Sequence, residues 1–385
     1  MQGSRGLRSD CHPAGFEAHR EMTATAAKNQ RRLRRLLFSG VACVLAVVLA
    51  APGTAAAKQR PHASLYWGAQ IGEQITGEAA PWDMNAVQRF QQATGKGLSL
   101  IQFSAPFAEC DNSGGNCVMT RFPGTPLENA RLYGAIPVFS WNSTSSPPSV
   151  DQPAFSLGKV IDGSFDSYIR EFALKAKAWG HPFFIRFNWE MNGFWFPWSE
   201  GVNGNTPGQF VAAWRHVHDI FTSVGATNVT WVWCPNVDLY DVLTPLGELY
   251  PGNEYVDWTG IDGFNWGQRR GSPGWLSFNQ VFHRTYKRIV DHVAPDKPVM
   301  LAEVASSDKG GSKPLWIKDM LSKVRHRYRK VRALIWYDLN DRGTHWPIET
   351  SKKSSRAFHA GIKAGAYKAN SYADLPAGPI QPPPR

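Results

Sequence analysis

The sequence predicts an α/β fold, a single-domain (β/α)8 or TIM barrel over residues 58–370. Eight short apolar segments recur along the chain, and most precede a segment whose apolar residues repeat with a period of about 3.6. These segments are too apolar for a sheet with one face in water, so they predict parallel strands covered by helices. A glycine-rich phosphate loop after the first segment would favour an open sheet, and none is there. The count of eight therefore favours the closed barrel.

Each predicted strand is a short run rich in apolar, β-branched and aromatic residues. The sequence shows no internal repeat and no second domain in this region. In chain order, the eight predicted strands are 64–70, 98–104, 135–141, 182–190, 229–236, 258–266, 298–305 and 333–340.

Amphipathic segments between these strands predict the covering helices at 83–95, 164–180, 206–225, 277–293 and 314–330. The third helix has the clearest boundaries. Thr206 is a good N-cap residue, Pro207 suits the first turn, and Gly225 lies just past the end. We therefore expect this helix to begin directly after Thr206.

Residues 1–57 predict an N-terminal extension with a signal peptide. The basic stretch RRLRR precedes an apolar run of 15 residues, LLFSGVACVLAVVLA, and small residues follow. This run is shorter than the roughly 20 residues that span a bilayer, which favours a cleaved signal over an anchor. We expect a secreted protein cleaved after Ala57, with Met22 as an alternative start. An uncleaved leader would instead hold the protein at the cell envelope.

The charge of the mature chain argues against a nucleic-acid partner. The full sequence has a net charge of +11, but without residues 1–57 it keeps 34 basic and 28 acidic residues, spread along the chain. Basic runs such as KVRHRYRK are typical of solvated helix faces. We expect a monomer whose only membrane contact is through the export signal. The Pro-rich segment 371–385 is predicted to be a disordered tail.

Three of the five cysteines lie outside the leader. Cys110 and Cys117 flank the short loop DNSGGN, and in an exported protein this spacing predicts a disulfide. Cys234 should be a buried thiol rather than a nucleophile, because no Cys/His arrangement accompanies it. NST at Asn142 and NVT at Asn228 fit the N-glycosylation pattern, although Asn228 directly precedes a predicted strand.

Two glutamates lie at the ends of predicted strands, where the active site of such a barrel forms. In RFNWEMNGFWFPW, the polar residues Arg186, Asn188 and Glu190 alternate with aromatic ones and should point together toward the barrel mouth. Glu303 lies near the end of the seventh strand. Strands four and seven occupy opposing parts of the ring, so the two carboxylates should face each other. Such a pair can hydrolyse a glycosidic bond, one as acid and the other as nucleophile or base.

Tryptophan is unusually abundant, with 16 residues in the chain. Sugars stack their C–H faces on indole rings, and a carboxylate among aromatic rings is costly to desolvate unless it is paired or protonated. The rings around Glu190 would also help it to keep a proton near neutral pH, while Arg186 would stabilise the charge of Glu303. The tryptophans at strand ends or in the following loops are the candidates for stacking on a sugar: Trp67, Trp141, Trp195, Trp198, Trp266 and Trp336.

These motifs resemble glycoside hydrolase family 26. The resemblance rests on RFNWEMNGFWFPW, VTWVWCPN, LAEVAS and ALIWYDLN, covers residues 62–368, and is most specific in EMNG and the tryptophans after it. It implies a (β/α)8 barrel with Glu190 as acid/base, Glu303 as nucleophile and Trp336 beneath the sugar being cleaved. A retaining pair of this kind should have its carboxyl groups about 5 to 5.5 Å apart. Asn236, in the second motif, is a further candidate for substrate binding.

The resemblance implies an endo-β-1,4-mannanase first, with β-1,3-xylan or mixed-linkage β-glucan as alternative substrates. Many family members carry His before the acid/base and Tyr at the end of strand six, where this sequence has Trp189 and Phe264. These departures support one rival function, a carbohydrate-binding barrel without turnover. No cofactor and no metal ion is expected for either function.

Overall fold

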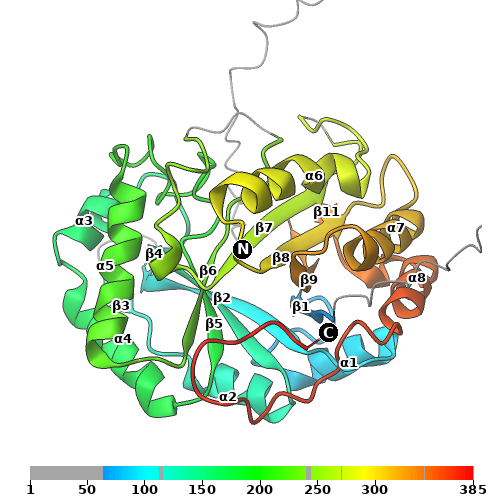
Figure 1. Cartoon of the computed structure of the whole chain (residues 1–385), viewed down its shortest axis with the longest axis horizontal. Coiled ribbons are helices and arrows are strands. Elements are labelled where there is room, and N and C mark those ends of the chain that lie inside the picture. The colour runs from blue at the N-terminus through cyan, green and yellow to red at the C-terminus, as the bar shows by residue number, and fades with distance from the viewer. Residues whose placement is uncertain (1–63, 112–115, 240–243, 270, 342, 385) are drawn as a thin grey trace, which may run out of the picture. The chain divides into compact units, whose positions relative to one another are not determined.

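A closed ring of eight parallel strands forms the centre of the described region (Figure 1). The computed structural model describes residues 64–384, apart from 112–115, 240–243, 270 and 342. Neighbouring strands pair around the ring, and β1 closes it by pairing with both β2 and β9. The predicted barrel is confirmed, with the strands β1 (Tyr66–Ile71), β2 (Leu100–Cys110), β4 (Ile136–Ser146), β5 (Phe183–Phe187), β6 (Val229–Trp233), β7 (Trp258–Asn265), β8 (Val299–Ser306) and β9 (Val331–Asp338).

A glycine permits the ring to close. Gly68 of β1 lies opposite Leu100 of β2, and a Cβ atom on Gly68 would lie only 1.9 Å from the Leu100 carbonyl oxygen. Any side chain at this position would therefore push the two backbones apart.

β2 and β4 continue beyond the ring as a paired arm. Their pairing reaches Glu109 opposite Ser146, well past the predicted strand ends. The short strand β3 (Cys117–Met119) pairs antiparallel with the end of β2. In the structure, a disulfide joins Cys110 to Cys117 at this point, as expected from their spacing.

Helices surround the ring (Figure 1). Five of them match predicted segments, and α2, α3 and α8 were not predicted. The described residues form α1 (Met84–Thr94), α2 (Gly124–Leu132), α3 (Leu157–Ile161), α4 (Asp166–Trp179), α5 (Gln209–Val224), α6 (Phe278–Arg288), α7 (Lys313–His326) and α8 (Lys352–Ile362).

The start of α5 differs from the prediction. Gly208, and not Thr206, directly precedes the helix. The backbone N–H groups of Gly208 and Phe210 donate to Glu200 Oε1 at 2.9 and 3.1 Å. A carboxylate from the preceding loop thus satisfies the helix donors that Thr206 was expected to satisfy. The helix ends at Val224, and Gly225 lies just past the end, as predicted.

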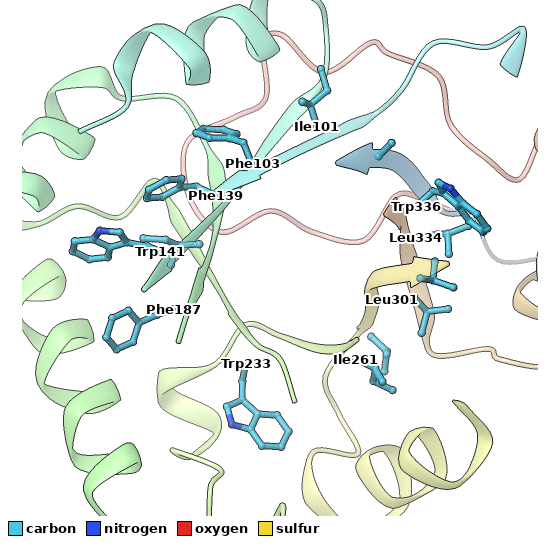
Figure 2. Packing of buried hydrophobic residues seen from close by; sticks show 14 of the residues in the cluster. Ile101, Phe103, Phe139, Trp141, Phe187, Trp233, Ile261, Leu301, Leu334 and Trp336 are labelled. Atoms are coloured by element: carbon cyan, nitrogen blue, oxygen red, sulfur yellow. The ribbon is translucent and has the colours of Figure 1, made fainter. Parts of the chain in front are cut away.

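Alternate residues of the strands divide between two apolar layers. Outward residues pack against the helices, and Figure 2 shows Trp141 and Trp336 in this outer layer on different sides of the ring. The side of the strand on which a residue lies decides whether it can reach the barrel mouth. Inward residues form a smaller cluster inside the ring: Tyr66, Leu100, Ile136, Val138, Phe184, Val232, Cys234, Trp258, Met300, Ala302, Ala333 and Ile335.

The C-terminal segment packs against the barrel, which corrects the predicted disordered tail at 371–385. Ile380 is buried in the inner cluster. Its N–H donates to Thr230 Oγ1 at 2.8 Å, and its carbonyl accepts from Trp258 Nε1 at 2.8 Å. Thr230 and Trp258 lie near the N-terminal ends of β6 and β7, so this segment covers the end of the ring opposite the mouth. The Pro-rich composition concealed the single apolar anchor.

The predicted leader, residues 1–57, lies outside the described residues. Within the described part of the chain, no helix has both the length and the apolar character needed to cross a membrane.

Candidate active site

A bulge in β8 brings Glu303 to the inside of the ring. Leu301 faces outward and Ala302 faces inward, so strict alternation would point Glu303 outward. However, Leu301 and Val304, three positions apart, pair with residues of β9 that are two positions apart. The extra residue lets Ala302 and Glu303 both face inward. Bulges re-aim side chains beside active sites in this way.

Arg186 holds the Glu303 carboxylate. It is fully buried, and its Nη1 donates to Glu303 Oε1 and to Ser140 Oγ, both at 3.0 Å. Its Nη2 donates to Asp262 Oδ2 at 2.5 Å. Although burial disfavours the charge, Asp262 and Glu303 raise the pKa of Arg186 above its ordinary value. Gln102 Nε2 makes a longer contact with the same Glu303 oxygen, at 3.4 Å.

The Glu190 carboxylate is positioned by a turn. β5 ends at Phe187, three residues before the predicted end, and Asn188 and Glu190 have positive φ angles of 45° and 53°. Residues other than glycine rarely adopt this conformation, which is enriched at functional sites. The Glu190 N–H donates to the Cys234 carbonyl at 2.7 Å. Its Oε2 accepts a hydrogen bond from Trp195 Nε1 at 2.6 Å.

The glycine of EMNG has a steric role. A Cβ atom on Gly193 would lie 2.5 Å from the ring of Trp195. Only glycine therefore lets the indole of Trp195 approach the Glu190 carboxylate in this arrangement.

Three carboxylates converge at the barrel mouth. One oxygen each of Glu190, Asp262 and Glu303 lies within 4.8 Å of the others. This is close to the separation of about 5 to 5.5 Å in retaining glycosidases and below the 6.5 to 9.5 Å of inverting ones. Burial raises the pKa of Asp262 well above its ordinary value, against the effect of Arg186, and the other two carboxylates raise it further. Each carboxylate already binds Arg186 or Trp195, which suits acid–base chemistry better than metal binding.

The two other polar residues of the fourth strand, Asn188 and Arg186, bind within the protein, and Arg186 pairs with Glu303 as predicted. Asn188 Oδ1 accepts from the Ser143 N–H and its Nδ2 donates to Ser143 Oγ, both at 2.8 Å. Asn188 therefore ties β5 to β4. Arg186 is fully buried and donates a hydrogen bond to Glu303. Trp189, at the position of the family's His, lies over Arg186, with 5.5 Å between the guanidinium carbon and the ring centroid.

Three candidate tryptophans from strands belong to the outer core, which corrects their predicted role as sugar platforms. Trp67, Trp141 and Trp336 are fully buried on the outward faces of β1, β4 and β9. Figure 2 shows the last two. Trp141 stacks on Phe172 of α4 with centroids 4.3 Å apart, and Trp336 meets Phe358 of α8 at 5.5 Å. These rings join strands to helices and cannot reach a ligand at the mouth.

The loop tryptophans are divided between core and surface. Trp198 is buried, and its Nε1 donates to the Trp189 carbonyl at 2.7 Å, so its predicted role as a platform is wrong. Trp195 and Trp266 remain partly exposed. Trp266 lines a surface pocket, and the guanidinium of Arg269 lies 4.8 Å from its ring centroid. Trp195 and Trp266 therefore remain the candidates for sugar stacking.

Two inward residues of the site, Gln102 and Asp262, were not predicted, and Tyr337 lies at an inward position beside Phe264. Gln102 and Asp262 are polar residues at inward positions of β2 and β7, a signal that strand alternation alone could have given. Tyr337 continues the inward series of β9, next to the outward Trp336. Its ring meets Phe264 at 5.3 Å, so a phenol lies beside the position at which family members carry Tyr.

Asn236 lies just beyond β6, beside the loop that carries Glu190. Its N–H donates to Asn192 Oδ1 at 2.8 Å, and its carbonyl accepts from Asn192 Nδ2 at 3.0 Å. The side-chain oxygen of Asn236 is buried and has no hydrogen-bond partner among the described residues. This acceptor is consistent with the predicted substrate contact.

Comparison with known sequences gives consistent matches. Residues 136–297 match the model of glycosyl hydrolase family 26. A segment of 211 residues is 41% identical to Endoglucanase H of Acetivibrio thermocellus, covering 54% of this chain and 23% of that protein. A segment of 124 residues is 27% identical to the β-1,3-xylanase TXYA of a Vibrio species, covering 30% and 25%. The chain thus spans about a quarter of the length of these curated relatives.

Solved structures with the same fold include proteins of this family. GH26C of Muricauda sp. MAR_2010_75 aligns with a TM-score of 0.59 and 16% identity over 82% of this chain and 91% of that one. The GH26 domain of a Prevotella bryantii endo-β-mannanase/endo-β-glucanase aligns with a TM-score of 0.57 and 15% identity over 81% and 92%. At these identities the likeness shows the fold alone. The match of residues 136–297 to the family model, within a barrel, agrees with the expected resemblance to glycosyl hydrolase family 26.

Proposed function

We propose that this chain is a retaining endo-β-glycanase, with Glu303 as nucleophile and Glu190 as acid/base. The observation that carries the proposal is the approach of one oxygen of each carboxylate to within 4.8 Å at the ends of β5 and β8. An inverting enzyme needs a wider gap, because a water molecule must fit between the base and the sugar. Here the nucleophile itself can reach the anomeric carbon.

The surroundings of each glutamate suit its step. Glu303, whose charge Arg186 compensates, attacks the anomeric carbon and forms an ester with the sugar while the bond to the leaving oxygen breaks. Glu190 gives its proton to that oxygen, and the Trp195 N–H fixes the direction of its carboxyl group. Glu190 then takes a proton from water. The resulting hydroxide attacks the same carbon and releases Glu303.

β-Glucan is the substrate that we propose to test first. The relative with 41% identity is named an endoglucanase, although the match spans 23% of that protein. β-1,4-Mannan, the expectation from the site motifs, is the alternative. Two solved structures of mannanases, Bacillus subtilis BCman and the Prevotella domain, share 19% and 15% identity with this chain. At these identities they support the fold alone. β-1,3-Xylan comes third, through the Vibrio relative.

The test is the release of reducing sugar from lichenan, mannan, xylan and curdlan, with the Glu303→Ala variant as control. An early mixture of oligosaccharides from one polymer would support internal cleavage by a glycanase. Binding of a polymer without any release would support the rival function, a carbohydrate-binding barrel without turnover.

We also propose that the chain is exported, as its N-terminal sequence predicts. N-terminal sequencing of protein from the culture medium is expected to begin at Lys58. Recovery of the intact leader in the membrane fraction would contradict cleavage and would support an envelope-held form.

A further inference from the structure

We propose that Asn142 and Gln102 form a hydroxyl-binding wall for the sugar held between Glu190 and Glu303. The inference rests on the proposed glycosidase function and adds two substrate contacts to it. Asn142 Oδ1 and Gln102 Oε1 are buried and have no hydrogen-bond partner among the described residues. Buried acceptors in folded proteins are nearly always paired. Two unpaired acceptors on adjacent strands of the site therefore indicate donors that a ligand supplies.

Asn142 faces the inside of the barrel mouth. It lies on β4 two residues beyond Ser140, which binds Arg186, so the two side chains share the inward face. Trp141, between them, points outward and stacks on Phe172. Asn142 is 8% exposed, so its amide borders the mouth while remaining inside the protein surface.

Gln102 places the second acceptor next to the nucleophile. Its Nε2 donates to Gln70 Oε1 at 2.9 Å and contacts Glu303 Oε1 at 3.4 Å. Because both of these neighbours are oxygen atoms, the end of the amide that faces them must be the nitrogen. The unpaired end is therefore the oxygen. It lies beside the carboxylate that would attack the anomeric carbon.

Two amide oxygens select the chemistry of the ligand. They accept hydrogen bonds and give none, so they suit a neutral group with several O–H donors and disfavour phosphate or carboxylate groups, which carry few protons at neutral pH. A sugar ring presents hydroxyls on neighbouring carbons and meets this requirement. The NST triplet at Asn142 is thus a substrate contact rather than a glycosylation site.

Asn228 provides a matched control. It is also a buried asparagine in an N-x-S/T triplet, but its Nδ2 donates to the carbonyls of Ala176 and His181 at 2.9 and 3.0 Å. It directly precedes β6 and so lies at the end of the barrel opposite the mouth. Removing a partnered asparagine destabilises the fold, whereas removing an unpaired buried acceptor does not. The two sites therefore predict opposite effects for the same substitution.

The test compares Asn142→Leu with Asn228→Leu. Both are made in the Glu303→Ala chain, so that calorimetry measures binding of gluco- and manno-oligosaccharides without turnover, and scanning calorimetry measures Tm. We expect Asn142→Leu to weaken binding about tenfold, as the loss of one hydrogen bond to the sugar implies, with Tm unchanged or higher. Asn228→Leu should lower Tm and keep the affinity. Asn142→Asp, which retains an acceptor, should recover most of the affinity.

The outcomes separate this inference from the proposed activity. Unchanged affinity in Asn142→Leu, or a fall in Tm like that of Asn228→Leu, would overturn the inference. If the wild-type chain hydrolyses none of the polymers but Asn142→Leu still weakens binding, the sugar contact stands and the glycanase proposal fails. If the wild-type chain hydrolyses a gluco- or manno-polymer but the Glu303→Ala chain binds none of the matching oligosaccharides, the sugar contact is overturned and the glycanase proposal stands.

Discussion

Single residues set the charge balance at the barrel mouth. Arg186 bonds to Asp262 and Glu303 directly, while Glu190 lies within 4.8 Å of both and is bonded to Trp195. One buried cation thus lies among three carboxylates, an arrangement that favours protonation of at least one of them. One bond of Arg186 holds Glu303, while its bonds to Ser140 and Asp262 hold the guanidinium in place, so the proposed nucleophile depends on a buried partner.

We expect alanine substitution of Glu303 and of Glu190 to reduce activity to different extents. Glu303→Ala should abolish hydrolysis of every substrate, because no ester can form. Glu190→Ala should lose roughly 10²- to 10⁴-fold on polysaccharides but keep activity on aryl glycosides whose leaving group needs no proton. Added azide should rescue it and give a β-glycosyl azide. Kinetics on both substrate types check this, and equal losses for the two variants, or a first product with the α configuration, would sink the assignment.

Asp262 predicts a pH-dependent stability. Below the ordinary aspartate pKa of about 4, Asp262 is protonated in the folded and the unfolded chain. Its pKa is raised in the folded state, so above pH 4 only the unfolded chain loses the proton. The free energy of unfolding then falls by about 1.4 kcal/mol per pH unit until the folded pKa is passed. Denaturant titrations from pH 4 upward should show this fall relative to Asp262→Asn, and a constant difference would contradict it.

Elements at the two ends of the ring position the site and cover the barrel. The turn after β5 carries Glu190, and the arm formed by β2 and β4 extends the wall that carries Gln102 and Asn142. At the opposite end, the C-terminal segment carries Ile380 into the inner cluster (red in Figure 1). The two ends of the ring therefore have separate roles, with the chemistry at one end and a covering segment at the other.

We expect removal of the C-terminal segment to lower the free energy of unfolding and to leave kcat unchanged. A chain that ends at residue 370 loses the burial of Ile380 and its two hydrogen bonds, to Thr230 and Trp258. Together these predict a loss of about 3 to 5 kcal/mol in the free energy of unfolding. Denaturant titration measures the loss, and kcat at a temperature where both chains are folded should be unchanged. Equal stability of the two chains would show that the segment is a dispensable tail.

Closure of the ring is the property of the whole molecule on which the site depends, because β5 and β8 can face each other only across a closed barrel. Gly68→Ala should therefore cost at least about 3 kcal/mol or prevent folding, since its Cβ would lie 1.9 Å from the Leu100 carbonyl oxygen. Gly247→Ala is the control. A Cβ there meets no atom within 4 Å, so we expect a change within about 0.5 kcal/mol. Similar melting temperatures for the two variants would contradict the role of Gly68.

The sequence by itself determined the parts of this protein that depend on local pattern. Runs of apolar residues and helical periodicity predicted eight strands, five helices and the barrel, and the motifs around Glu190 and Glu303 indicated the family. These signals are local, because each side chain's neighbours within an element follow from the period of that element.

Only the tertiary structure decided which side of each strand a residue occupies and what it meets there. Glu303 faces inward through a bulge whose register is set by β9, and Trp336 faces outward while Tyr337 takes the inward position. Asp262 joins the site through Arg186, and Ile380 anchors a segment that composition marked as disordered. Each of these depends on pairing between strands that are distant in the sequence. A one-residue shift in such a pairing exchanges the two faces, and no local pattern encodes it.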